Sequence, residues 1–165
     1  ARATAAAVAR AGVSVVALPQ TNLFLQGRGV PAAVPRGLTA VRALLDARAV
    51  LAAGGDNVRD PFNPMGRSDA CEAASLLVSA GHLSTVEAWH AVSSGARRAM
   101  GLPEPAVAVG AAAELLALRA ESLDAAVAGA ATQRLVFSRG RLLARTRVEH
   151  EVFSRDAAVT SSTRR

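Results

Sequence analysis

An aspartate follows directly on an apolar stretch that has the character of a buried strand. Residues 49–53 are all apolar, two glycines come next, and Asp56 follows them. Parallel α/β folds place their chemistry at the carboxyl ends of such strands. The glycines permit a sharp turn, and two prolines stiffen the loop that follows. The pattern therefore predicts a carboxylate on a rigid rim, suited to binding a metal ion or transferring a proton.

The same aspartate also has a structural interpretation. An Asp-Asn pair before a proline-rich loop is common turn chemistry, in which the carboxylate caps the next turn. Both interpretations of Asp56 stay open on the local pattern alone.

The elements that must position this loop alternate between helix and strand, which is typical of βα units in a parallel sheet. The first part of the chain is expected to hold a helix over residues 4–11, a strand over 13–18, a loop over 20–37, a helix over 40–47 capped by Thr39, and a strand over 49–53. Because the two long loops leave the carboxyl ends of parallel strands, they should lie at one edge of the sheet.

Beyond the second loop, helical patterns give way to short strands. Ser68 or Asp69 should cap a helix that reaches about residue 80, and Ser84 with Glu87 has the capping-box spacing for a helix that reaches about residue 100. The remaining elements are expected to be strands over 107–109, 115–118, 134–137 and 142–146, with a helix over 122–130 and a hairpin turn over 138–141.

Composition narrows the class of protein. With 165 residues, 51% of them hydrophobic, the chain can build one core. No apolar run approaches the roughly 18 residues of a membrane span, so a membrane partner is not expected. Cys71 is the single cysteine, which fits a reducing, cytoplasmic setting. The net charge of +6 comes from arginines, but the few aromatic residues are not interleaved with them, so the sequence does not favour nucleic-acid binding.

Three motifs together resemble the cytosine deaminase group of the amidohydrolase superfamily. They are PQTNLFLQGR at residues 19–28, PRGLT at 35–39 and GGDNVRDPFNPMG at 54–66. The resemblance spans residues 1 to about 147. It implies an α/β fold that is the carboxyl-terminal part of a metal-dependent hydrolase (β/α)8 TIM barrel, with residues 13–18 as strand seven and 49–53 as strand eight. It divides the chain into a barrel segment over 1–100, a small β-sandwich segment over 101–153 and a disordered tail over 154–165.

The resemblance also assigns roles to residues of the aspartate loop. Asp56 matches the position that binds a divalent metal ion, zinc or iron, and shuttles protons during catalysis. Asn57 and Phe62 resemble positions that line the base-binding pocket, with a turn amide and a loop anchor as their structural alternatives. The family's histidine ligands have no counterparts here, and His82, His90 and His150 are expected to be structural or solvated.

The implied activity is hydrolysis of a C–N bond in a cyclic amidine or amide, as in conversion of cytosine and water to uracil and ammonia. The substrate would be a small nucleobase-like molecule, and triazines or cyclic amides are alternative substrates. The implied partner is the missing amino-terminal part of the barrel, and the full enzyme could be a homo-oligomer. Because the metal ligands are incomplete, we expect the isolated chain to be inert; the alternative is a non-catalytic remnant or docking subunit.

Overall fold

The computed structural model describes residues 1–104 and 106–153, so the tail expected over 154–165 lies outside the described residues. The elements, in chain order, are α1 (Arg2–Arg10), β1 (Val15–Ala17), α2 (Pro19–Leu25), α3 (Val41–Asp46), β2 (Leu51–Ala53), α4 (Ala70–Ser79), α5 (Thr85–Val92), α6 (Ser94–Ala99), β3 (Leu115–Leu118), α7 (Leu123–Ala128), β4 (Arg134–Ser138) and β5 (Arg141–Thr146). None of the described helices is long and apolar enough to cross a membrane.

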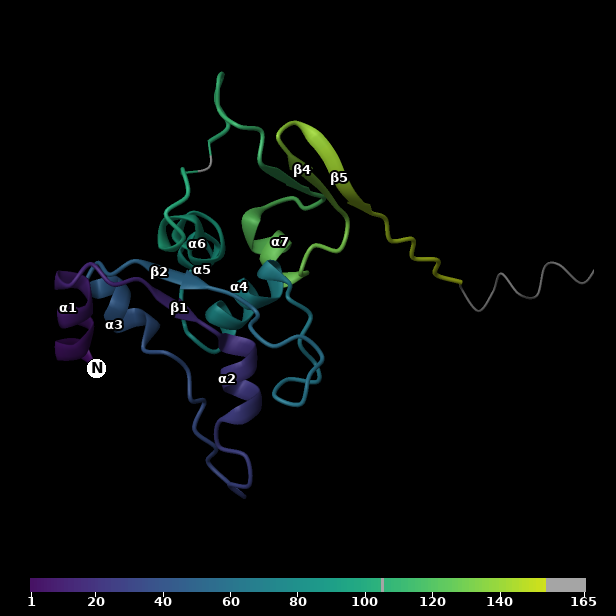
Figure 1. Ribbon diagram of the computed structural model, residues 1–165. Helices are drawn as coiled ribbons and strands as arrows, with labels where there is room; N and C mark the ends of the chain where they lie inside the picture. The colour runs from purple at the N-terminus through teal and green to yellow at the C-terminus, as the bar shows by residue number, and fades with distance from the viewer. Residues whose placement is uncertain (105, 154–165) are drawn as a thin grey trace, which may run out of the picture.

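A parallel pair of strands lies among the helices of the first part of the chain (Figure 1). β1 and β2 run side by side, with Ala17 opposite Ala53 at their carboxyl ends. The loops that follow the two strands therefore leave the same edge, as the sequence predicts. All of β2 is buried, whereas Val16 at the centre of β1 is 51% exposed.

Small side chains form much of the core around this pair. Ala74 in α4 and Ala88 and Ala91 in α5 are almost fully buried, together with Leu77 and Leu83. Alanine adds little bulk between two helices, so α4 and α5 can pack closely against each other and against β2. The lone Cys71 is also buried in α4, where its thiol acts as one more small apolar group.

Polar side chains cap α4 and α5, as the sequence predicts. Asp69 accepts a hydrogen bond from the backbone N–H of Cys71 at the start of α4. Ser84 and Glu87 form the expected capping box of α5. Hydrogen bonds from Arg42, and then from Ser84, lower the pKa of Glu87 to about 2. These bonds keep the Glu87 carboxylate ionised and fix where α5 begins.

Two expectations for the first part of the chain are wrong. The loop expected over 20–37 begins with α2 instead, because Pro19 at its first position has the helical φ and its first turn is buried. Thr39 does not cap the next helix; Ala40 precedes α3 and supplies no side-chain hydrogen bond.

The helix expected to run from 84 to about 100 is broken into α5 and α6. The hydroxyl of Ser93 donates to the carbonyl oxygen of Trp89 at 2.6 Å, in place of a regular continuation of the helix. Gly95 then lies so close to β2 that a Cβ there would collide with the carbonyl oxygen of Leu51. The break lets α6 approach the strand directly.

A second sheet contains β3, β4 and β5 in that order, all antiparallel. Arg139 and Gly140, both at positive φ, make the predicted hairpin turn between β4 and β5. Residues 107–109 form no strand, contrary to expectation, and Val107 and Val109 are almost fully exposed. Figure 1 places this sheet beyond α7, away from the parallel pair.

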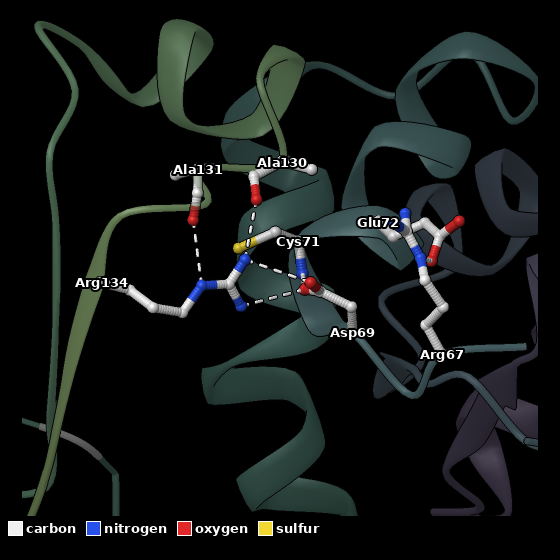
Figure 2. Close-up of polar contacts among 7 residues, drawn as sticks. All are labelled: Arg67, Asp69, Cys71, Glu72, Ala130, Ala131 and Arg134. Carbon is white, nitrogen blue, oxygen red and sulfur yellow. Dashed lines mark hydrogen bonds and ion pairs between the residues drawn. The ribbon is translucent and has the colours of Figure 1, made fainter. Parts of the chain in front are cut away.

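One arginine ties the second sheet to the helices. The guanidinium of Arg134, at the start of β4, donates to the Asp69 carboxylate at 3.3 and 3.1 Å. It also donates to the carbonyl oxygens of Ala130 at 2.7 Å and Ala131 at 2.9 Å (Figure 2). We call this set the Arg134 clamp. Both charged side chains are about four-fifths buried, so the ion pair is shielded from water.

We predict that Arg134→Met lowers the free energy of unfolding by about 1.5–3 kcal/mol, because hydrogen bonds to charged groups contribute that much and Asp69 loses its partner. Arg145→Met, on the exposed strand β5, is the matched control and should change stability much less. Urea unfolding measures both. Equal effects of the two substitutions would contradict the role of the clamp.

The same ion pair predicts a dependence of stability on pH. Burial raises the pKa of Asp69, but the hydrogen bonds from Arg134 and from the Cys71 N–H outweigh it, so the net pKa lies below the ordinary value. A carboxylate with a lowered folded pKa stabilises the protein above its unfolded pKa of about 3.9. That stabilisation is lost as the pH falls through the folded pKa.

We therefore expect the free-energy difference between wild type and Asp69→Asn to be constant near neutral pH and to shrink below about pH 4. Urea unfolding at a series of pH values measures the difference. If the difference instead grows as the solution is acidified, the pKa of Asp69 is not lowered in the folded protein.

Candidate functional site

The candidate site is the loop that joins β2 to α4. The backbone N–H of Gly54 donates to the carbonyl oxygen of Ala17 at 3.1 Å, so the pairing of the two strands extends to the first residue of the loop. Asp56 comes two residues later, exposed and with a φ of +60°. Its carboxylate takes no part in the hydrogen bonds that order the loop. The structure thus presents a free carboxylate at the carboxyl edge of the parallel pair.

Asp60, rather than Asp56, caps the turn in this loop. Its Oδ1 accepts hydrogen bonds from the backbone N–H groups of Phe62 at 2.9 Å and Asn63 at 3.0 Å. Its Oδ2 accepts one from the side-chain amide of Asn57 at 2.6 Å. The hydrogen bond from Asn57, followed by those from the two backbone groups, lowers the pKa of Asp60. Asp60 therefore caps the turn, the structural role that the sequence left open for Asp56.

The structure brings Asp56, Asn57 and Phe62 into one loop. Asn57 is half-buried, and its Nδ2 is held by Asp60. Phe62 is 61% exposed, and its backbone N–H donates to the Asp60 carboxylate. Asn63, next to it, is buried. Asp56 and Phe62 therefore lie in a loop that is held by hydrogen bonds within it.

Close backbone packing supports the peptide just before Asp56. A Cβ placed on Gly55 would lie 2.9 Å from the Cα of Ser68 and 3.2 Å from the Oε1 of Gln20. The hydroxyl of Thr21 donates to the carbonyl oxygen of Gly55 at 3.5 Å, at the limit of hydrogen-bonding distance. Because only glycine fits at this position, the first turn of α2 and the segment before α4 can both press against the loop.

The described residues do not form a complete set of metal ligands. No group of three or more His, Cys, Asp or Glu side chains among them could hold a metal ion. His82 and His90 are engaged elsewhere: Nη1 of Arg36 donates to Nε2 of His82 at 2.8 Å, and Nδ1 of His90 lies 3.0 Å from the hydroxyl of Ser94. A metal at Asp56 would need ligands from outside the described residues.

Two residues of this region, Asp60 and Gln20, were not among the predicted site residues. Asp60 had a readable signal, since Asp-Pro-Phe-Asn is the pattern of a type I turn with its acceptor at the first position. Gln20 had none, because it was placed in a loop and only the burial of the first turn of α2 reveals it.

Known proteins resemble this chain in sequence. The sequence profile of the amidohydrolase family matches residues 1–144. A pterin deaminase of Rhizobium rhizogenes is 33% identical over 151 residues, which are 88% of this chain and 34% of that protein. The chain thus spans about a third of the length of the curated relative.

Solved structures resemble the fold over most of its length. One is 5-methylcytosine deaminase from Klebsiella pneumoniae liganded with 5-fluorocytosine, with a TM-score of 0.77 and 25% identity over 93% of this chain and 39% of that one. Another is N-isopropylammelide isopropylaminohydrolase from Burkholderia multivorans, with a TM-score of 0.69 and 31% identity over 88% of this chain and 35% of that one.

Gly55→Ala is predicted to destabilise the protein, because the new Cβ would meet the backbone of Ser68 at 2.9 Å. Overpacking of this kind costs about 1–3 kcal/mol. Gly54→Ala is the matched control, since a Cβ there meets nothing within 4 Å, and its effect should stay within about 1 kcal/mol. Urea unfolding of both variants measures the contrast, and equal losses would refute the close packing at Gly55.

Proposed function

The chain belongs to the amidohydrolase family, and we propose that it forms part of a metal-dependent enzyme that hydrolyses a C–N bond in a cyclic amidine or amide. Two of the similar proteins are named deaminases and a third an isopropylaminohydrolase, which supports this reaction class. A cytoplasmic setting belongs to the same proposal. Burial raises the pKa of the Cys71 thiol, which fits a cysteine that stays reduced.

The single observation that carries the proposal is the place of Asp56. Its carboxylate stands exposed just beyond the carboxyl end of β2, while Asp60 makes the turn. In parallel α/β folds this edge is where reacting groups lie. An acidic side chain that the local structure does not use for folding is free to act on a ligand.

We assign Asp56 two roles in the reaction: to bind the metal ion and to move a proton. A divalent ion, zinc or iron in this proposal, would lower the pKa of a water bound to it towards neutrality. The Asp56 carboxylate accepts a proton from the attacking water and donates it to the nitrogen that leaves as ammonia or amine. Asn57 and Phe62, in the same loop, would contact the ring of the substrate.

The most favoured substrate in this class is cytosine or a close analogue, which would give uracil and ammonia. The likeness to 5-methylcytosine deaminase and the three sequence motifs support it. A pterin or an N-substituted ammelide are the competing rings, because proteins named for them are similar to this chain.

We further propose that β1 and β2 are strands seven and eight of a (β/α)8 TIM barrel within residues 1–100. Residues 101–153 would then belong to a small β-sandwich. The free edges of the parallel pair and the 51% exposure of Val16 support a partner that continues the sheet. That partner would be the amino-terminal part of the barrel, which would bring the remaining metal ligands; the complete enzyme could be a homo-oligomer.

A non-catalytic remnant or docking subunit is the second candidate function. The observation that favours it is the incomplete ligand set among the described residues. The two candidates differ in one measurable respect, because only an enzyme releases ammonia or amine from a ring in a metal-dependent manner.

In the full protein that carries this chain, Asp56→Asn should lower kcat for such a release by about 100- to 10,000-fold, the usual contribution of a general acid–base group. Asparagine accepts the positive φ of this position, so the fold should be undisturbed. Ammonia release from cytosine, 5-methylcytosine and a pterin, and amine release from an N-substituted ammelide, measure the activity, and bound zinc or iron measures the metal site.

The matched control is Asp46→Asn, an exposed carboxylate at the end of α3, which should leave activity unchanged. Full activity in the Asp56 variant would exclude the catalytic role of Asp56. No release from any of these rings by the metal-loaded wild type would favour the non-catalytic alternative.

A further inference from the structure

We propose that the antiparallel sheet carries a binding site for the phosphate group of a small ligand, and that the guanidinium groups of Arg119, Arg145 and Arg147 form it. These residues lie at β3 and β5, on a different sheet from the strand that leads to Asp56. The site is therefore independent of the reaction proposed for Asp56.

An open cavity of about 460 Å³ lies against this sheet. Its lining comes from consecutive residues at each strand: Ala117, Leu118 and Arg119 at β3, Gln133, Arg134 and Leu135 at β4, and Arg145, Thr146 and Arg147 at β5. None of these residues is an aspartate or a glutamate. Glu121 and Glu149, two residues from Arg119 and Arg147, are exposed and do not line it. The cavity thus gathers several arginines without a carboxylate from its described lining.

The pairing of the strands arranges the lining residues in rows across the sheet. The first row is Ala117, Leu135 and Arg145, and the second is Leu118, Arg134 and Thr146. The third row continues the same register with Arg119, Gln133 and Arg147. The backbone N–H of Arg119 donates to the carbonyl oxygen of Gln133 at 3.1 Å, as this register requires.

The alternation of side chains decides which rows face the cavity. Side chains of neighbouring rows point to opposite faces of a sheet. The guanidinium of Arg134, in the second row, reaches Asp69 on the face turned towards α4 (Figure 2). The first and third rows therefore project from the opposite face. That face holds Arg145 from the first row and Arg119 and Arg147 from the third.

The described residues leave the positive charge of this face unbalanced. Nη1 of Arg119 donates to Oε1 of Gln133 at 3.3 Å, and Nε2 of Gln133 donates to the carbonyl oxygen of Val148 at 2.7 Å. Because glutamine is neutral, these bonds hold the ends of the strands without cancelling a charge. Arg145 and Arg147 are exposed and form no ion pair with another described residue.

A phosphate group fits both the charge and the donors of this site. At neutral pH a phosphate ester carries about −1.5 to −2 charges and has three acceptor oxygens. Guanidinium groups bind such oxygens through pairs of parallel hydrogen bonds. A carboxylate has one charge and two oxygens, so it would satisfy fewer of the three guanidiniums. Arg119 and Arg147 belong to the outer strands, whose backbones are roughly 10 Å apart, so a group bound between them can contact both side chains.

The site predicts phosphate binding that depends on particular arginines. Isothermal titration calorimetry of the full protein that carries this chain, at about 0.1 M NaCl, measures binding of inorganic phosphate and of glycerol 3-phosphate. The wild type should bind at least one of them with a Kd of about 1 mM or lower. Arg145→Gln and Arg147→Gln should each weaken binding about tenfold or more, because each removes a charged hydrogen-bond donor. Tighter binding of glycerol 3-phosphate would identify an ester as the ligand, and equal or weaker binding would identify free phosphate.

Arg141→Gln is the matched control, because Arg141 is also exposed on β5 but does not line the cavity. It removes the same charge and should leave the Kd almost unchanged. All three substitutions are at exposed positions, so the midpoint of thermal unfolding should stay close to that of the wild type.

Absence of saturable binding to the wild type would overturn the site, as would unchanged binding in Arg145→Gln and Arg147→Gln. Equal weakening by Arg141→Gln and Arg147→Gln would also overturn it, because binding would then follow net charge. None of these measurements involves release of ammonia or amine, so their outcome does not depend on the proposed function.

Discussion

The Arg134 clamp is a polar link between the antiparallel sheet and the helices. Arg134 joins the start of β4 to the carboxylate of Asp69 and to two carbonyl oxygens at the end of α7, so the antiparallel sheet and the helices that cover β2 are held in one arrangement. Lysine could not replace it, because a planar guanidinium offers several donors in fixed directions and an ammonium group does not. Asp69 serves twice, since it also caps α4.

That double use links the Arg134 clamp to the candidate site. Asp69 is preceded by Ser68, whose backbone lies against Gly55 so closely that only glycine fits. Gly55 in turn precedes Asp56. From the other side, the first turn of α2 presses on the same glycine. Contacts from the first turn of α2 and from the segment before α4 thus set the position of the exposed carboxylate. The hydrogen bonds of Asp60 hold the rest of the loop.

Sequence alone gives the features that arise from local chemistry. The capping box of Ser84 and Glu87, the Asp69 cap and the hairpin at Gly140 are confirmed, because each depends on residues close together in the chain. The parallel strands are confirmed too, because each is a short apolar run and the alternation of helix and strand favours parallel pairing. The family is confirmed as well. The break at Ser93 and the burial of Gln20 were not predictable, since they depend on the approach of β2 to α6 and of α2 to a loop more than thirty residues away. The role of Asp56 stays a prediction.

The two edges of the antiparallel sheet differ in how they would receive another strand. β5, at one edge, carries Arg141 and Arg145 among its exposed side chains. Like charges on an edge oppose edge-to-edge aggregation, and this protection weakens as salt screens the charges. β3, at the other edge, is Leu-Leu-Ala-Leu and has no charge of its own. If this sheet paired with a second copy of itself, pairing through β3 would therefore be favoured over pairing through β5.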